Sequence, residues 1–139
     1  MPESLNLETL TIAEARSAML SGSVTASALA AQHYDRIAAV DPKINSFLAL
    51  TRDRAILQAA KVDAAVKSGD TSALGPLAGV PIGIKDVLVM QGTPTTAGSL
   101  ILKGYHPPYD ATAVAKLEAA GAILLGKLNC DEFAMGSSN

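Results

Sequence analysis

Lys85 is the residue in this sequence that is best placed to do chemistry. It lies in the segment Val80-Pro-Ile-Gly-Ile-Lys-Asp86, which is otherwise almost entirely apolar, and Gly83 leaves space beside it on one face of a strand. If that face is buried, lost hydration lowers the lysine pKa from about 10.4 and makes the neutral amine available as a general base. The alternative is that Lys85 and Asp86 mark the point where the strand leaves the core for solvent. Spacing alone leaves both interpretations open.

Two glycine-containing segments have the composition of anion sites. Residues 121–127 fit the pattern Gly-x-x-x-x-Gly-Lys of a phosphate loop, but Leu128 stands where Mg²⁺ requires Ser or Thr, and the intervening residues have the pattern of a strand. We therefore reject a nucleotide site there. Gly136-Ser137-Ser138 offers backbone N–H groups and small hydroxyls of the kind that line an anion or carbonyl site. A plain surface loop is the alternative.

The other polar candidates have structural interpretations. His33 falls on the apolar face of a predicted helix, as a core or interface histidine, and His106 precedes two prolines in a loop. Asp131 and Glu132 are expected to complement the dipole of a short helical turn, and Cys130, the single cysteine, is expected to be a small buried side chain. Metal-ligand spacing is missing from the predicted helices, which argues against a metal site.

Helical periodicity dominates the first 70 residues. Thr11 and Glu14 form a capping-box pattern before a first helix that Gly22 ends. A second helix is expected from about residues 23–25 to just before Pro42, and a third over about 52–66, with a short strand between them at 46–50. The expected buried positions are Ala26, Leu29, Ala30, His33 and Ile37 in the second helix, and Ile56, Ala59, Ala60 and Ala64 in the third.

After Leu74 the pattern changes to strand, helix, glycine, strand. Residues 80–90 alternate between apolar and other side chains as in a strand, and 122–125 are expected to form a buried strand. Between them, Asp110 is expected to cap a helix, and Gly121 is expected to end it in the left-handed backbone conformation. This order is typical of an α/β sheet with a crossover helix. We therefore expect an N-terminal helical segment over residues 1–73 and, over 74–139, the beginning of an α/β core that is incomplete, because so few strands leave open sheet edges.

Composition narrows the classes of function. The chain has 139 residues, is 49% hydrophobic and carries a formal net charge of −2, with basic residues scattered singly rather than clustered as in nucleic-acid-binding surfaces. No stretch approaches the roughly 18 apolar residues of a membrane helix, and the first residues lack the pattern of a secretory signal. These features predict a soluble cytoplasmic protein that does not engage a membrane.

Several segments in the second half resemble the amidase signature family. They are Gly75-Pro-Leu-Ala-Gly-Val-Pro-Ile-Gly-Ile-Lys-Asp86, Gly92 with Thr95, Thr96 and Ser99, Pro107-Pro-Tyr-Asp-Ala-Thr112, Gly121-Ala-Ile-Leu-Leu-Gly-Lys-Leu-Asn129, and Asp131-Glu-Phe-Ala-Met-Gly-Ser-Ser-Asn139. Within the family, the resemblance is strongest to the branch formed by the A subunits of aspartyl/glutamyl-tRNA amidotransferases. The helices before residue 75 fit more loosely.

The resemblance implies a mixed sheet flanked by helices, and amide hydrolysis by a Ser–cis-Ser–Lys triad in which Lys85 is the lysine. In that scheme the neutral lysine takes a proton through a bridging serine, the nucleophilic serine attacks the amide carbon, and backbone N–H groups stabilise the oxyanion. Met135, Gly136 and Ser137 are then expected to lie near the substrate pocket.

The sequence also departs from the family pattern. Family members are several times longer, both triad serines belong to motifs beyond residue 139, and Val87 stands where the family usually has Asn. We therefore expect an N-terminal fragment of a larger enzyme, inactive by itself because the nucleophile and the bridging serine lie outside this chain.

For the whole enzyme, the resemblance implies a glutaminase that releases ammonia from glutamine, or from another small amide, for amidation of misacylated Glu-tRNA(Gln) or Asp-tRNA(Asn). The expected partners are the B and C subunits, through which tRNA is reached. ATP and Mg²⁺ are expected only at the partner, with no cofactor in this chain. The alternatives are a free-standing amidase acting on small amides and, in another class, a non-catalytic remnant or docking fragment.

Overall fold

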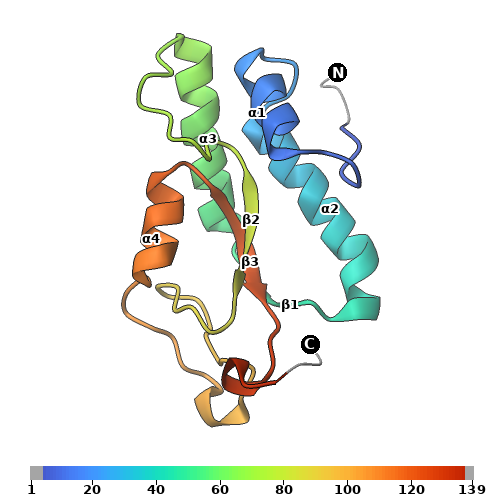
Figure 1. Cartoon of the computed structure of the whole chain (residues 1–139), viewed down its shortest axis with the longest axis vertical. Helices are drawn as coiled ribbons and strands as arrows, with labels where there is room; N and C mark the ends of the chain where they lie inside the picture. The colour runs from blue at the N-terminus through green and yellow to red at the C-terminus, as the bar shows by residue number, and fades with distance from the viewer. Residues whose placement is uncertain (1–4, 137–139) are drawn as a thin grey trace.

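The computed structural model describes residues 5–136 and contains a small mixed sheet between helices (Figure 1). The elements, in chain order, are α1 (Ile12–Leu20), α2 (Ala26–Ile44), β1 (Phe47–Leu50), α3 (Arg52–Ser68), β2 (Pro81–Lys85), the 3₁₀ turn η1 (Leu100–Leu102), α4 (Thr112–Ala119), β3 (Ile123–Leu128) and the 3₁₀ turn η2 (Glu132–Ala134). The predicted fold class, α/β with a mixed sheet flanked by helices, is confirmed.

The sheet has three strands in the order β1-β3-β2, so the last strand in the sequence lies in the middle. β2 runs parallel to β3 and β1 runs antiparallel to it. Gly126 allows β1 to approach closely, because a Cβ at this position would lie 2.3 Å from the Ala49 carbonyl oxygen. β3 thus pairs with β1, which belongs to the predicted helical segment, and with β2, which belongs to the predicted α/β core. The predicted domain boundary between residues 73 and 74 stays a prediction.

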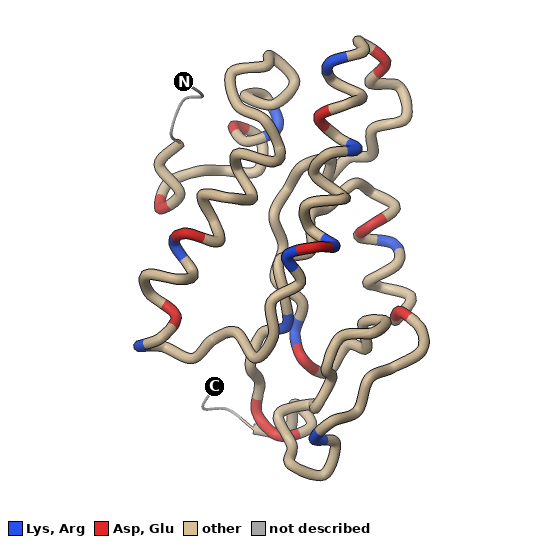
Figure 2. Tube along the Cα trace, turned by 180° about the vertical axis from the view of Figure 1, so that it is seen from behind, with Lys and Arg blue, Asp and Glu red and all other residues tan. Residues whose placement is uncertain are grey.

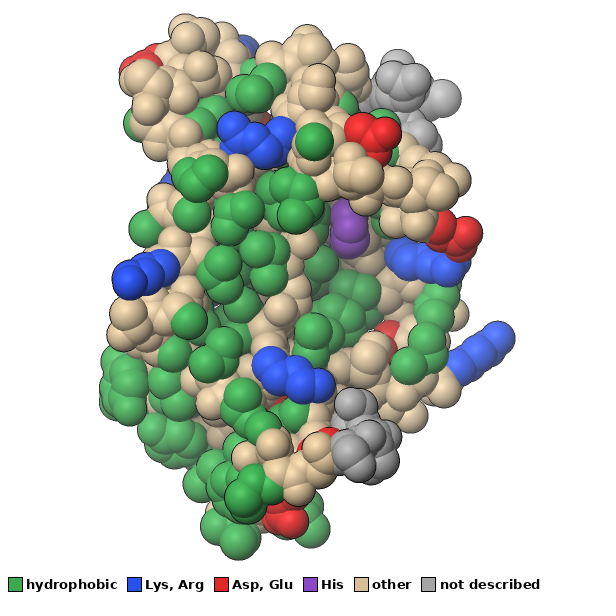
Figure 3. Space-filling model, in the orientation of Figure 1, with side chains coloured by type: hydrophobic (Ala, Val, Ile, Leu, Met, Phe, Trp, Pro, Cys, Tyr) green, Lys and Arg blue, Asp and Glu red, His purple; other side chains and the backbone are tan. Residues whose placement is uncertain are grey.

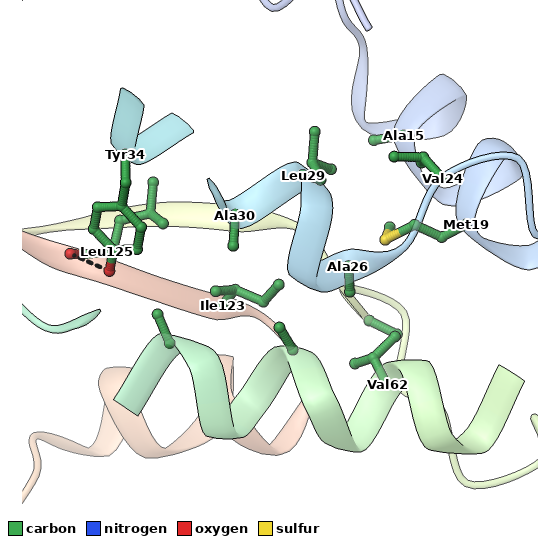
Figure 4. Packing of buried hydrophobic residues seen from close by; sticks show 13 residues of the cluster. Ala15, Met19, Val24, Ala26, Leu29, Ala30, Tyr34, Val62, Ile123 and Leu125 are labelled. Atoms are coloured by element: carbon green, nitrogen blue, oxygen red, sulfur yellow. Dashed lines mark hydrogen bonds between the residues drawn. The ribbon is translucent and has the colours of Figure 1, made fainter. Parts of the chain in front are cut away.

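Each face of the sheet packs against a separate apolar cluster. On one face, α1, α2 and α3 pack small side chains around Ile123 and Leu125 of β3 (Figure 4). On the other face, Val114 of α4 packs with Ile84 and Leu124. The alternation of β3 residues between the two clusters is the period-2 pattern of a strand that is buried on both sides.

Side chains complete the edge of β3 where β1 is too short to reach. Beyond the last β1 pair, the Thr51 hydroxyl donates to the Leu124 carbonyl at 2.7 Å, and the Leu124 N–H donates to Oε1 of Gln58 at 2.8 Å. The hydroxyl of Tyr34, from α2, donates to the Leu125 carbonyl at 2.9 Å. The same carbonyl also accepts from the Thr51 N–H at 3.0 Å. A buried backbone group without a partner is costly, so the side chains of Thr51 and Gln58 substitute for a neighbouring strand at Leu124.

Several predicted boundaries and caps are confirmed. The capping box joins Thr11 and Glu14 in both directions, and α1 ends before Gly22. β1 lies within the predicted range 46–50, β3 is almost completely buried, and Gly121 takes a left-handed φ of 91° directly after α4.

The predicted end of the second helix is wrong. α2 continues through Pro42 to Ile44. Pro42 lies in the last turn, where its missing N–H would have paired with the carbonyl of Ala38. Because Ala38 is exposed, the absence of this hydrogen bond costs little stability. The turn is then closed by left-handed Asn45, whose N–H donates to the Asp41 carbonyl at 2.7 Å.

The buried stripe predicted for the third helix is also wrong, apart from Ala59. Ile56, Ala60 and Ala64 are exposed, and α3 instead buries Ala55, Gln58, Ala59 and Val62. The buried face of α3 thus differs from the predicted one, and it places Gln58 at the edge of β3. In α2, His33 and Ile37 are half-buried, and the large buried side chain at this turn is Tyr34.

Two further expectations fail in the second half. β2 ends at Lys85 instead of continuing toward Met90, because the chain turns there and the Leu88 N–H donates to the Lys85 carbonyl at 3.0 Å. Asp110 does not cap α4, whose N-cap is Ala111 without a side-chain cap bond. The Asp110 carboxylate binds the guanidinium of Arg54 instead, a stronger partner than a backbone N–H.

We predict that Gln58→Met lowers the free energy of unfolding by about 1–3 kcal/mol, because the variant keeps volume and helix propensity but leaves the buried Leu124 N–H without an acceptor. Urea denaturation of the variant and the wild type measures this loss. Lys61→Met, at an exposed position of the same helix, is the matched control and should stay within about 0.5 kcal/mol of the wild type. Equal stabilities for the two variants would contradict the role assigned to Gln58.

Candidate functional site

The carboxyl ends of β2 and β3 meet at one edge of the sheet, which is the edge where α/β folds usually bind ligands. Lys85 is the last residue of β2, and Leu128 ends β3 beside it. Two loops close on this edge, residues 86–99 after β2 and residues 129–136 after β3. In Figure 2, blue (basic) and red (acidic) positions lie next to one another at this edge of the sheet.

Lys85 is exposed on this edge. Its Nζ donates a hydrogen bond to the carbonyl of Asn129 at 2.6 Å, at the start of the segment after β3. Among the described residues, the side chain of Lys85 is not buried, and the strand leaves the core at this point. The assignment of Lys85 as the catalytic lysine stays a prediction from the family resemblance.

Asp86, the next residue, points the other way and is completely buried. Its Oδ2 accepts hydrogen bonds from the backbone N–H of Thr96 at 2.9 Å and from the hydroxyl of Thr96 at 2.6 Å. Its Oδ1 lies 2.8 Å from Nζ of Lys127. Burial by itself raises the pKa of this carboxyl, but the contacts with Lys127 and Thr96 outweigh burial and hold the pKa of Asp86 below its ordinary value.

Lys127 is the buried lysine of this region, with no exposed surface. Besides Asp86, its Nζ has the hydroxyl of Thr95 as a partner, at 2.8 Å. Sequence reasoning considered Lys127 only as part of the rejected phosphate loop. The signal was nevertheless present, because a lysine inside a strand of otherwise apolar residues requires a buried counter-charge.

Backbone contacts join the turn after β2 to both loops. The Asp86 N–H donates to the Leu128 carbonyl at 2.9 Å, and the Ala97 N–H donates to the Asp86 carbonyl at 3.2 Å. Gly98 lies so close to the segment after β3 that a Cβ there would be 2.5 Å from the Cys130 carbonyl oxygen. The Asp86–Lys127 pair therefore lies under a layer formed by both loops.

The predicted pocket residues lie at the end of the described chain. Met135 is 81% exposed, and Gly136 is exposed beside the side chain of Asp131. Ser137 lies outside the described residues. The role of these residues in substrate binding stays a prediction.

The region around η1 and η2 presents large apolar side chains to solvent. Leu100 and Ile101 are 86% and 80% exposed, and Phe133 and Met135 lie on the segment beside them. Figure 3 shows hydrophobic side chains gathered at this lower end of the molecule. Large exposed apolar patches mark sites where protein, membrane or ligand binds.

The other polar candidates have local structural partners. His33 Nδ1 lies 2.8 Å from the Leu29 carbonyl oxygen, and His106 Nδ1 lies 3.0 Å from that of Gly104. Cys130 is buried, as predicted. Glu132 accepts a hydrogen bond from the Ser99 hydroxyl at 2.5 Å. Among residues 5–136, no group of three His, Cys, Asp or Glu side chains is arranged to hold a metal ion.

A second charged network, which sequence reasoning missed, joins α3 to α4 away from Lys85. The guanidinium of Arg54 binds both oxygens of Asp110, at 3.0 and 2.7 Å, and also contacts Glu118, which accepts from Gln58. The hydrogen bond to Asp110 is the main cause that raises the pKa of Arg54, and the same contact lowers the pKa of Asp110. These residues are far apart in sequence, so no local pattern reveals the network.

Residues 28–139 match the family described as Amidase. The chain belongs to the amidase family. This confirms the resemblance given by the sequence motifs and assigns the chain to a family of enzymes. Among residues 5–136, the helices lack the length and the continuous apolar sequence of a membrane-spanning segment.

Relatives of this amidase chain are similar along nearly its whole length. It is 54% identical over 135 residues to the A subunit of glutamyl-tRNA(Gln) amidotransferase from Koribacter versatilis, covering 97% of this chain and 28% of that protein. The protein of the same name from Streptomyces avermitilis is 49% identical over 134 residues, covering 96% of this chain and 26% of that protein. The chain thus spans about a quarter of the length of the curated relatives it matches.

Solved amidase structures have the same fold. An inhibitor-bound structure, described as a vestigial protein complex that reveals the origins of an s-triazine catabolic enzyme, matches with a TM-score of 0.85 and 38% identity, covering 91% of this chain and 28% of that one. The native peptide amidase of Stenotrophomonas maltophilia matches with a TM-score of 0.81 and 35% identity, covering 90% and 26%.

We predict that Lys127→Met lowers the free energy of unfolding by about 3–5 kcal/mol, because it leaves the Asp86 carboxylate buried without its counter-charge. The double variant Asp86→Asn/Lys127→Met removes both charges and should recover most of this loss. Urea denaturation of the wild type, both single variants and the double variant gives the coupling between the two residues. Additive effects would show that the pair is not coupled.

The same pair predicts a dependence of stability on pH. Because the pKa of Asp86 is lower in the folded than in the unfolded chain, its contribution is fully present above the unfolded value of about 3.9 and is lost as the pH falls through the folded pKa. Stability measured from pH 6 downward should therefore fall less steeply in Asp86→Asn/Lys127→Met than in the wild type. Parallel curves would contradict an ionised Asp86.

Proposed function

We propose that this chain is the N-terminal part of the glutaminase subunit of a tRNA-dependent amidotransferase. The observation that carries the proposal is the similarity, at about 50% identity over almost the whole chain, to proteins named as the A subunits of glutamyl-tRNA(Gln) amidotransferases. The exposed apolar surface around η1 and η2 supports a longer polypeptide that covers this end of the molecule.

In the proposed reaction, Lys85 is the general base of a Ser–cis-Ser–Lys triad whose serines belong to the rest of the polypeptide. The proton of the nucleophilic serine passes through the bridging serine to the lysine amine, and the serine oxygen forms a bond to the amide carbon of glutamine. The C–N bond then breaks, ammonia leaves with a proton returned along the same path, and water releases glutamate from the acyl-enzyme. The hydrogen bond from Lys85 to the Asn129 carbonyl fixes the amine at the open edge of the sheet.

The partners belong to the same proposal. The B and C subunits use the ammonia to amidate misacylated Glu-tRNA(Gln) or Asp-tRNA(Asn), and tRNA reaches the glutaminase through them. ATP and Mg²⁺ act at the partner, and this chain needs no cofactor of its own.

A free-standing amidase that hydrolyses small amides is the second candidate. The similarity to the peptide amidase structure, at 35% identity, favours it. Hydrolysis of small amides without any partner protein would support this candidate, whereas ammonia release from glutamine that is stimulated by the B and C subunits and misacylated tRNA would support the amidotransferase.

The first test is the intact mass of the native protein. A mass several times the 14.2 kDa of this chain is expected. A mass near 14.2 kDa would contradict the proposal and leave a docking or vestigial role, because a base without a nucleophile does not form an acyl-enzyme.

In the native protein, we expect Lys85→Ala to lower the rate of ammonia release from glutamine by at least about 100-fold, the usual contribution of a general base. The matched control is Lys43→Ala, which removes an exposed lysine in the last turn of α2 and should leave the rate unchanged. The isolated 139-residue chain should release no ammonia. Turnover by the isolated chain, or an active Lys85→Ala enzyme, would overturn the assignment of this lysine.

A further inference from the structure

The segment after β3 makes a turn that its residue types do not favour. Phe133 and Ala134, both in η2, have left-handed backbone conformations, with φ of 52° and 56°. Residues with a side chain adopt such values rarely, and then singly rather than in succession, because Cβ comes too close to the following carbonyl oxygen. A strained conformation of this kind persists only where the surrounding structure holds it.

The loop after β2 supplies contacts that hold this turn. The Phe133 N–H donates to the Ala97 carbonyl at 2.8 Å, and the hydroxyl of Ser99 donates to Oε1 of Glu132 at 2.5 Å. Within the turn, the Met135 N–H donates to the Glu132 carbonyl at 3.1 Å. Glu132 therefore binds the loop through its side chain and Met135 through its backbone.

The loop is itself fixed from the buried side of the sheet edge. Oδ2 of Asp86 accepts from the N–H and the hydroxyl of Thr96, and the Thr95 hydroxyl lies 2.8 Å from Nζ of Lys127. Ser99 is only 4% exposed, whereas Glu132 is exposed. Because the donor is buried and the acceptor is at the surface, the hydrogen bond restrains the segment after β3 more than it restrains the loop.

We propose that Ser99 and Glu132 are positioning residues for the substrate pocket. Their hydrogen bond holds the turn of η2 in its strained conformation and thereby fixes where Met135 and Gly136 lie. Neither side chain touches the substrate or the reacting atoms. The effect on catalysis rests on the proposed function, in which Met135 and Gly136 lie near the amide substrate, but the restraint on the turn does not.

The main test is Glu132→Met in the native protein, with ammonia release measured over a range of glutamine concentrations. KM should rise by about 10-fold, the equivalent of one charge-assisted hydrogen bond, because the turn relaxes and the pocket residues move with it. The constant kcat should stay within about 3-fold, because the Lys85 amine is bound to Asn129, before the turn. An unchanged KM, or a fall in kcat as large as the rise in KM, would overturn the inference.

The conservative variant Glu132→Gln distinguishes the hydrogen bond from the charge. It keeps an acceptor oxygen for the Ser99 hydroxyl but removes the carboxylate charge, and both constants should stay within about 2-fold of the wild type. Glu8→Met, at an exposed carboxylate before α1, is the matched control and should change neither constant. If Glu132→Gln raises KM as much as Glu132→Met, the positioning role is wrong.

Ser99→Ala removes the donor and provides a second variant. Since the Ser99 hydroxyl also accepts from the Ile101 N–H at 3.2 Å, this change affects η1 as well. If both residues act through one hydrogen bond, the double variant Ser99→Ala/Glu132→Met raises KM no further than the larger single effect. Additive effects on KM would contradict the shared contact.

Hydrogen–deuterium exchange separates this inference from the proposed function. In Glu132→Met, amides of residues 130–136 should exchange at least about 5-fold faster than in the wild type, because the bond from Phe133 to Ala97 opens more often, while amides of β3 keep their rates. Unchanged exchange in 130–136, or equally faster exchange in β3, would overturn the inference. If the native wild-type protein releases no ammonia from any amide, the proposed function fails, and the exchange rates still test the contact.

Discussion

The rest of the structure depends on the hydrogen-bonding needs of β3. This strand lies in the middle of the sheet, is buried on both faces, and has to find a partner for each backbone N–H and carbonyl. β2 satisfies one edge, and on the other edge β1 covers the strand only from Gly126 onward. Thr51 and Gln58 supply the missing partners at Leu124, and Tyr34 adds a second donor to the Leu125 carbonyl. The positions of α2 and α3 are therefore set by polar contacts with a strand backbone as well as by apolar packing.

Two charged networks add further polar contacts between elements that are distant in the sequence. Arg54, with Asp110 and Glu118, connects α3 to α4 at the surface, where the charges are partly hydrated. Asp86 and Lys127 are fully buried at the carboxyl ends of the parallel strands. A surface pair of this kind adds little to stability, whereas a buried pair fixes the backbone on both sides of it, since either charge alone would be costly.

Local patterns predicted local structure well. The capping box at Thr11, the left-handed glycine at 121 and the buried run of β3 depend on interactions within a few residues, and all three are present. The motifs around Lys85 also identified the family, because short segments in a fixed order carry that information.

The predictions were wrong where residues distant in the sequence determine which side chains are buried or paired. Ile56 and Gln58 are both compatible with a helix, and the choice of buried face was made by Leu124, 66 residues after Gln58. Asp110 has the composition of a cap, but Arg54 competes for it from 56 residues away. Burial of Lys85 was one of two open interpretations, and Lys85 is exposed, while Lys127 takes the buried position because its partner Asp86 points inward. The first two outcomes are not visible in a window of neighbouring residues, whereas the apolar strand around Lys127 did contain the signal of a buried lysine.

The position of the last strand in the middle of the sheet also sets the order of events during synthesis. The Tyr34 hydroxyl has no acceptor until the ribosome has added the Leu125 carbonyl, 91 residues later in the chain. At about 5–20 residues per second, this separation corresponds to roughly 5–18 s of translation. Until β3 emerges from the ribosome, α1, α2 and α3 hold an unfilled apolar face, and β1 and β2 have no strand to pair with. The first half of this chain therefore exposes apolar surface and unpaired strand edges throughout this interval.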